Sequence, residues 1–267
     1  MKSNEEPIAS VATLEWANYA ATLATANVTP GLDVILRDDV VITTSDVFPS
    51  PDANHACLLR ATAQTVDHLI TTVINHFKAK HLDTTIFVSP ACTPSDLPDR
   101  LLARQFTRKE AEEAWLAFDL ANSQLPAPLP NVMVRPVARD EVLTIAEIFL
   151  ATFEMPTDLA PFLARLLEPS LEVPTVHHYI ALIEEQPVGT CSLLRYENFG
   201  ILGSAGVLPT HRGSGAATNL VIRAAADARK RGVDTLITQT TADTRLERLL
   251  RLSGFKRAFT RTCYTLP

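Results

Sequence analysis

The chain has 267 residues, of which 46% are hydrophobic, so it is long enough to bury a substantial core and to form two domains. Its formal net charge of −6 argues against a broad surface for nucleic acid or anionic membrane. The first residues carry charges where a signal peptide has its apolar core, and apolar runs of about eighteen residues do not occur. We therefore expect a cytosolic protein with neither a nucleic-acid nor a membrane partner.

The four cysteines are scattered along the chain. No two of them form a C-x-x-C pair, so the spacing indicates neither a zinc site nor a disulfide framework. We expect reduced side chains and no bound metal. The cysteines are Cys57, Cys92, Cys191 and Cys263.

Helical and strand patterns alternate through the first 106 residues. They predict a helix over 9–26 and a hairpin with strands at 34–36 and 40–42. An amphipathic helix is expected after Pro49 and Pro51, with Leu59 to Phe77 along one face. A strand over 83–88 and a short helix over 95–106 follow.

A proline-rich stretch then separates two halves of the chain. Pro126, Pro128 and Pro130 lie within residues 121–130, which hold few apolar side chains and so predict a semi-rigid extended linker. The expected organisation is a first domain over 1–122, a linker over 123–131 and a second domain over 132–267.

The second half begins with alternating elements of the same kind. They predict a strand over 132–137, a helix capped by Asp140, a second helix over 157–167, strands at 179–183 and 188–194 and, later in the chain, strands at 234–238 and 259–265.

Backbone freedom is concentrated at one place in this half. Five of the nine glycines fall at positions 200, 203, 206, 213 and 215. An apolar strand ends at Pro209, a turn follows, and apolar residues then repeat at helical spacing from Ala217 to Gly232. The sequence therefore predicts a glycine-rich loop that opens a helix.

Such a loop suits an anion. The first turn of a helix has unpaired N–H groups, and side chains at 213 and 215 would keep a phosphate away from them. Arg212 adds a positive charge, which favours a phosphate or pyrophosphate cradle. The loop has no lysine for a Walker motif, and Thr218 stands where the dinucleotide fingerprint needs glycine or alanine.

The pattern Val207-x-Pro209 followed by Arg212-x-x-Gly215-x-Ala217 resembles the acyl-CoA motif of the GNAT-type N-acetyltransferase superfamily. The resemblance extends from about residue 132 to the end of the chain. It implies an α/β (α+β) fold of two GNAT-like domains, each a mixed, mostly antiparallel sheet flanked by helices. It also implies acetyl-CoA as cosubstrate and a primary amine as acceptor.

Carried over residue by residue, the resemblance assigns the backbone next to Pro209 to the pantetheine arm and the following loop to the pyrophosphate. The first group is Ala205, Gly206 and Val207; the second is Arg212, Gly213, Ser214, Gly215, Ala216 and Ala217.

Both halves share an order of strand, helix and phenylalanine. Arg100-Leu101-Leu102 leads to Phe106 as Arg248-Leu249-Leu250 leads to Phe255, which indicates a diverged internal duplication. In the first copy, residues 48–54 would occupy the place of the phosphate loop. They contain no glycine and no arginine, so we expect a degenerate copy that binds no CoA, as in other tandem GNAT proteins.

The chemistry is less well defined than the binding. Many superfamily members carry a glutamate on the glycine-rich strand and a tyrosine before the Gly-Phe pair, where this chain has Ser204-Ala205-Gly206 and Leu250. The catalytic residues are therefore unassigned. Ionisable candidates remain at Glu154, Tyr196, Glu197, His211 and Tyr264, each of which also suits an ordinary surface or strand position.

Two further groups of polar residues have ordinary explanations. His177 and His178 are adjacent in a strand and point to opposite faces, so they are unsuited to one metal. Asp243, Arg245 and Arg248 either line the 3′-phosphate of CoA or form a solvated helix face, which we favour.

Three functions stay open at this point. The first is an N-acetyltransferase acting on a small-molecule or peptide amine. The second is a catalytically inactive acyl-CoA-binding or sensing protein, suggested by the missing glutamate and tyrosine. The third is an interaction module joined to a structural relic. The acceptor and the oligomeric state are not specified by the sequence.

Overall fold

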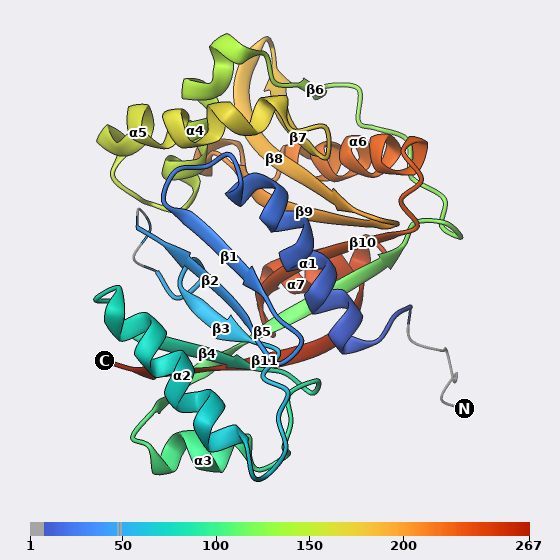
Figure 1. The fold of residues 1–267 in the computed structure, drawn as a ribbon. Helices are drawn as coiled ribbons and strands as arrows, with labels where there is room; N and C mark the ends of the chain where they lie inside the picture. The colour runs from blue at the N-terminus through green and yellow to red at the C-terminus, as the bar shows by residue number, and fades with distance from the viewer. Residues whose placement is uncertain (1–7, 47, 49) are drawn as a thin grey trace. The chain divides into compact units, whose positions relative to one another are not determined.

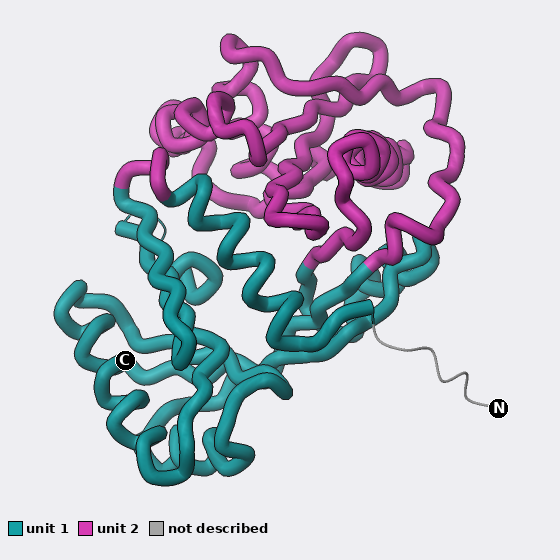
Figure 2. Tube along the Cα trace, turned by 45° about the vertical axis from the view of Figure 1, so that its right-hand side comes forward, with its two compact units in different colours: residues 1–26, 31–117, 239–267 teal, residues 27–30, 118–238 magenta. Residues whose placement is uncertain are grey.

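The computed structural model describes residues 8–46, 48 and 50–267. Packing divides the chain into two compact units (Figure 2). Unit 1 contains the described residues up to Ala26, Gly31–Ala117 and Gln239–Pro267, and unit 2 contains Asn27–Pro30 and Phe118–Thr238. This division differs from the linear one expected from the sequence, because the C-terminal segment packs with the first half of the chain.

Unit 1 is a mixed sheet with helices. Its strands follow one another in the order β1 (Leu32–Leu36), β2 (Val41–Ser45), β3 (His55–Cys57), β4 (Thr84–Val88), β11 (Lys256–Leu266) and β5 (Thr107–Asp119), and only β3 and β4 are parallel. The helices are α1 (Val11–Ala26), α2 (Val66–Ala79), α3 (Leu97–Ala103) and α7 (Arg245–Leu252) (Figure 1).

The C-terminal strand β11 explains the division into units. It pairs antiparallel with β4 on one side, where Tyr264 faces Ile86, and with β5 on the other, where Phe259 faces Trp115. An antiparallel ladder on each side holds β11 in this sheet. Residues distant in sequence thus form one core, a pairing that local sequence patterns do not reveal.

The predicted first helix, hairpin, strand over 83–88 and short helix are confirmed. The long helix is wrong in its start, because His55–Cys57 form β3 and α2 begins only at Val66. The loop that leads into α2 is therefore 58–65 and not the expected 48–54. It has Arg60 but no glycine. Within 48–54, Pro49 lies outside the described residues. Strand β5 was not predicted, since its exposed first half is charged and breaks the strand pattern.

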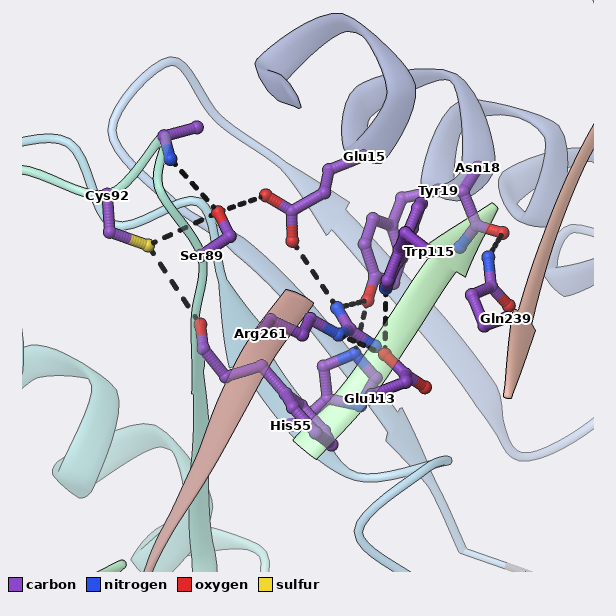
Figure 3. Close-up of polar contacts among 12 residues, drawn as sticks. Glu15, Asn18, Tyr19, His55, Ser89, Cys92, Glu113, Trp115, Gln239 and Arg261 are labelled. Carbon is purple, nitrogen blue, oxygen red and sulfur yellow. Dashed lines mark hydrogen bonds and ion pairs between the residues drawn. The ribbon is translucent and has the colours of Figure 1, made fainter. Parts of the chain in front are cut away.

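A buried arginine connects the helix and strands of unit 1 (Figure 3). The side chain of Arg261 on β11 is 5% exposed and donates from Nη1 to Tyr19 Oη at 2.7 Å. It also forms ion pairs with Glu15 of α1, at 3.5 Å, and with Glu113 of β5. A buried charge of this kind is stable only while its partners remain.

Two neighbours complete this network. Tyr19 Oη lies 2.6 Å from His55 Nε2, and His55 Nδ1 lies 2.9 Å from the carbonyl of Pro51. Burial lowers the pKa of His55 to about 3, so the ring is neutral, with Nδ1–H donating to Pro51 and Nε2 accepting from Tyr19. Ser89 Oγ donates to Glu15 at 2.5 Å. Since His55 and Glu15 have both polar atoms bonded, this network is structural.

Unit 2 has the same architecture. Its strands follow the order β10 (Thr235–Thr241), β9 (Phe199–Val207), β8 (Gln186–Tyr196), β7 (Val176–Ile183) and β6 (Met133–Pro136), with only β9 and β10 parallel. The α-helices are α4 (Val142–Thr152), α5 (Ala160–Leu167) and α6 (Ala216–Lys230), and the 3₁₀ turns are η1 (Arg139–Glu141), η2 (Thr157–Leu159), η3 (Glu168–Glu172) and η4 (Pro209–His211).

Two glycines show that α4 and α6 pack on opposite faces of this sheet. A Cβ at Gly206 would meet Thr152 of α4, whereas one at Gly189, paired with Val207, would meet Leu220 of α6. The elements predicted for 132–238 are present, and the expected class, mixed and mostly antiparallel sheets flanked by helices, is confirmed.

The described part of the chain contains no helix long and apolar enough to cross a membrane. All four cysteines are buried and free.

Replacing Arg261 with methionine keeps much of the side-chain volume and leaves Glu15 and Glu113 without their cation. We expect the free energy of unfolding to fall by about 3–5 kcal/mol, as for other buried ion pairs broken on one side. Urea denaturation followed by circular dichroism measures the change. The exposed Arg245→Met is the matched control, and an equal effect of both variants would refute the assigned role.

Candidate functional site

Strand β9 separates from β10 after the first third of its length. The two strands pair only between Phe199–Ile201 and Thr235–Ile237, although β9 continues to Val207. Ser204 has a φ of 47°, and the β8 register shifts between Thr190 and Ser192, which marks a bulge. The backbone of 203–207 therefore has no β10 ladder within the described residues. The residues expected to face pantetheine, Ala205, Gly206 and Val207, lie on this open edge.

The loop after β9 turns directly into α6. η4 precedes Arg212, and Gly213 and Gly215 both adopt left-handed conformations, with φ of 87° and 89°. Gly215 is the N-cap, and α6 begins at Ala216. Only glycine adopts these angles without strain, so the predicted glycine-rich loop opening a helix is confirmed.

Several N–H groups of this loop have no partner. The amides of Gly213, Gly215, Ala217 and Thr218 find no acceptor within the described chain, whereas the amide of Ser214 donates to His211 O at 3.2 Å. Unpaired donors at a helix N-terminus attract anions. The backbone therefore fits a phosphate-bearing group at this position.

Arg212 supplies a positive charge at the same place. Its side chain is exposed, and its one hydrogen bond within the described residues runs from Nη2 to Thr152 O at 3.3 Å. This weak contact leaves most of the guanidinium donors available. The predicted loop residues Arg212, Gly213, Ser214, Gly215, Ala216 and Ala217 thus lie in one continuous turn.

The two glycines of the loop, Gly213 and Gly215, have different surroundings. A Cβ at Gly213 would meet nothing within 4 Å, so this position opens onto free space. A Cβ at Gly215 would lie 2.2 Å from Leu129 Cδ1, in the segment that joins the two halves of the chain. Gly215 thus accommodates the end of the Leu129 side chain, in addition to its φ and to the ligand access inferred from the sequence.

Thr152 at the end of α4 was not identified from the sequence. Its side chain occupies the place where a Cβ at Gly206 would be, and its hydroxyl is buried without a hydrogen-bond partner in the described residues. A polar atom buried in this way is unusual. No local signal marks it, because Thr152 and Gly206 are brought together only by packing of α4 on the sheet.

A hollow of about 410 Å³ lies beside the loop, on the α4 side of unit 2. Leu208, which precedes Pro209, forms part of its wall, and Glu147 is its one ionisable lining residue. The remaining lining residues are Thr144, Ile148, Ala151, Thr157 and Pro187.

Two candidate ionisable residues lie near the loop. His211 ends η4, and its Nδ1 lies 3.0 Å from Thr210 Oγ1. Glu154 is exposed just after α4, with a φ of 55°.

Three other candidates lie elsewhere. Tyr196 and Glu197 lie at the β8–β9 turn, at the opposite end of β9 from Val207. The strand between them is about 25 Å long at ~3.3 Å per residue. Tyr264 is buried in the core of unit 1, 4% exposed. These three residues therefore have positions that a structural role explains.

The helix-face group near the C-terminus is solvated in unit 1. Asp243 is 85% exposed and accepts from Arg257 at 2.7 Å. Arg245 and Arg248 are exposed. Their positions agree with a solvated helix face.

His177 and His178 point to opposite faces, as predicted. His178 lies between two hydroxyls on the α5 side of the sheet, with Nε2 2.7 Å from Ser170 Oγ and Nδ1 2.7 Å from Ser192 Oγ. Ser170 Oγ donates to Leu167 O, so it accepts from His178, and Ser192 donates to Nδ1. This cluster is a satisfied core network. Among residues 8–46, 48 and 50–267, no group of three or more His, Cys, Asp or Glu could hold a metal ion.

In a comparison with known families, residues 142–255 match the model described as the acetyltransferase (GNAT) family. No curated protein matches the sequence.

Solved structures resemble nearly the whole chain. A GCN5-related N-acetyltransferase from Kribbella flavida has a TM-score of 0.67 at 18% identity, covering 93% of this chain and 95% of its own. A tandem GNAT protein from the clavulanic acid biosynthesis pathway has a TM-score of 0.64 at 13% identity, covering 92% and 86%. A GCN5-related N-acetyltransferase from Sphaerobacter thermophilus has a TM-score of 0.62 at 17% identity, covering 89% and 82%. At these identities the likeness shows the fold.

Substituting alanine at Gly215 should destabilise the protein more than at Gly213. Both changes force a left-handed alanine, at about 1–2 kcal/mol. Gly215→Ala also crowds Leu129 Cδ1, which adds about 1 kcal/mol because the clash involves the end of a side chain. Thermal unfolding compares the two variants. Adding Leu129→Ala to Gly215→Ala should restore the extra stability that Gly215→Ala loses relative to Gly213→Ala. If it restores none, the contact between position 215 and Leu129 is not the cause.

Acidification should destabilise the protein through His178. Burial, with a smaller contribution from His177, lowers the pKa of His178 to about 4, against about 6.5 in an unfolded chain. The unfolded chain therefore takes up the proton first. Stability is complete above pH ~6.5 and falls by about 1.4 kcal/mol per pH unit as the pH approaches 4.

The pH dependence of urea unfolding measures this contribution. Between pH 6 and 4.5, His178→Gln should show a slope smaller than that of the unsubstituted protein by about 1.4 kcal/mol per pH unit. Equal slopes would show that the folded state does not hold His178 neutral.

Proposed function

Because residues 142–255 match the model described as the acetyltransferase (GNAT) family, we propose that this protein transfers the acetyl group of acetyl-CoA to a primary amine. The observation that carries the proposal is the set of unpartnered N–H groups at the start of α6, directly after a strand whose edge is open. These two features suit the two ends of a pantetheine diphosphate.

The loop and strand would share the cosubstrate. The pyrophosphate would lie on the amides of Gly213, Gly215 and Ala217, with Arg212 providing a charge-assisted hydrogen bond. The pantetheine arm would follow the backbone of 205–207. An N–H near Val207 would polarise the thioester carbonyl, as a donor does in an oxyanion hole.

The reaction needs an uncharged amine. Its nitrogen attacks the thioester carbon, the C–N bond forms and the C–S bond breaks, while one amine proton leaves for a base and the thiolate accepts a proton. No residue is assigned as base. The hollow beside Leu208 offers space for an acceptor, and the carboxylate of Glu147 favours a cationic one, whether a small amine or a peptide N-terminus.

A second function is favoured by one observation. The open segment of β9, Ser204-Ala205-Gly206, carries no ionisable side chain, which also suits a protein that binds acyl-CoA without turning it over. Release of free thiol from acetyl-CoA with a panel of amines separates the two. A binding protein gives saturable calorimetric binding and no thiol above background.

The first copy would play a different part. Its loop over 58–65 contains Arg60 but no glycine, and the N-cap of α2, Thr65, has a φ of −104°, so it lacks the left-handed cap that opens α6. We therefore propose that residues 1–122 bind no CoA and serve packing or acceptor binding, with the transferase chemistry assigned to 132–267.

Replacing Arg212 with alanine should weaken acetyl-CoA binding about tenfold or more. The change removes a charge-assisted phosphate contact of roughly 1.5–3 kcal/mol, whereas an exposed side chain contributes little to folding. Isothermal titration calorimetry measures the affinity and thermal unfolding checks the fold. Lys230→Met removes a charge from the other end of α6 and should leave affinity unchanged. A collapse of stability with unchanged affinity would make the loop structural.

A further inference from the structure

The segment joining the two halves of the chain is attached to α6 at both ends. Near the last turn of α6, Arg229 Nη2 donates to Leu120 O at 2.7 Å and to Ser123 O at 2.5 Å. Near the first turn, the side chain of Asn219 binds Leu129. Residues 120–132 therefore run along the helix towards its N-terminus and do not form a free spacer.

Asn219 holds this segment with its whole amide. Oδ1 accepts from the N–H of Leu129 at 2.9 Å, and Nδ2 donates to Leu129 O at 2.9 Å and to Val132 O at 2.8 Å. The residue is 2% exposed. A rotated amide would place donor against donor, so only one orientation satisfies the three bonds.

The same residue closes the first turn of α6. Its backbone N–H donates to Gly215 O at 3.0 Å, while Leu129 Cδ1 fills the place of a Cβ on Gly215. The left-handed Gly215 is thus fixed from the helix by the Asn219 backbone and from outside by the segment that the Asn219 side chain holds. The direction of the free amides at 213, 215 and 217 depends on this turn.

We propose that Asn219 is a positioning residue for the diphosphate: by holding Leu129 against Gly215, it keeps the unpaired N–H groups of the α6 N-terminus in one orientation. The proposal rests on the proposed function of this loop. Asparagine is a poor residue for a helix interior, and a buried amide is costly unless it is bonded. A local reason is therefore needed for its presence, and the clamp on Leu129 supplies one.

Positioning implies a reciprocal effect. If docking of 129–132 increases the affinity of the loop for a diphosphate, a bound diphosphate must stabilise the docked segment by the same factor. The Leu129 amide reports this docking, because its hydrogen bond is made to the Asn219 side chain. If Asn219 only stabilised the fold, CoA would protect the Leu129 amide no more than amides that exchange through global unfolding.

The test compares Asn219→Ala with Asn122→Ala, an exposed asparagine of the same segment whose side chain bonds only Asp119. Calorimetry with CoA should show affinity at least about fivefold lower for Asn219→Ala and unchanged for Asn122→Ala. In the unsubstituted protein, saturating CoA should slow hydrogen exchange of the Leu129 amide by a similar factor. Unchanged affinity together with unchanged exchange overturns the proposal.

A second variant covers the case in which Asn219→Ala does not fold. Leu129→Ala removes a side chain that is 43% exposed and keeps the backbone bonds to Asn219. We expect a several-fold loss of CoA affinity with an unfolding temperature close to that of the unsubstituted protein. An increase in affinity would show that Leu129 obstructs the loop, contrary to the proposal.

Failure of the proposed function is recognised separately. If the unsubstituted protein shows no saturable binding of CoA, the acetyl-CoA assignment falls. Inorganic pyrophosphate, followed by NMR at the amides of Gly213 and Ala217, then tests positioning alone: Asn219→Ala should bind it more weakly. Equal binding, or none to either protein, overturns the proposal.

Discussion

The structure of unit 2 depends on one constraint, a helix that begins with N–H groups for which the described residues provide no acceptor. Gly213, Gly215, Ala217 and Thr218 expose their amides together, and the left-handed Gly215 turns the chain so that they do. Every helix begins with unpaired N–H groups, and here they are accessible from outside. Their arrangement beside Arg212 suits the diphosphate that we propose for this site, and the open edge of β9 suits the arm attached to it.

A closed polar network in unit 1 and the open start of α6 in unit 2 differ in what they leave for a ligand. In unit 1, Arg261 is surrounded by Glu15, Glu113 and Tyr19, and the network is closed on itself. In unit 2, the N–H donors at the start of α6 and the hydroxyl of Thr152 have no partner among the described residues. A satisfied network contributes to one unique core. Several free donors gathered at one helix N-terminus beside Arg212 suit an anion, which is why we propose the site in unit 2.

The three glycines near the proposed site have different surroundings. Gly213 adjoins open space, Gly215 accommodates Leu129, and Gly206 accommodates Thr152. The sequence predicts ligand access to the backbone at Gly213 and Gly215, and the resemblance assigns the backbone of Gly206 to the pantetheine arm. The structure retains that explanation for Gly213 and adds a packing contact within the protein for the other two.

Local patterns in the sequence determined the helices with regular apolar faces, the hairpin strands, the turn from β9 into α6 and the class of each sheet, because these depend on neighbours a few residues apart. Tertiary structure alone decided that Lys256–Leu266 joins the sheet of unit 1, that His55–Cys57 form a strand, and that Leu129 reaches Gly215. Thr152 was missed for the same reason. Pairing between distant segments leaves no periodic signal in either one, since it is set by the free energy of the whole packed core.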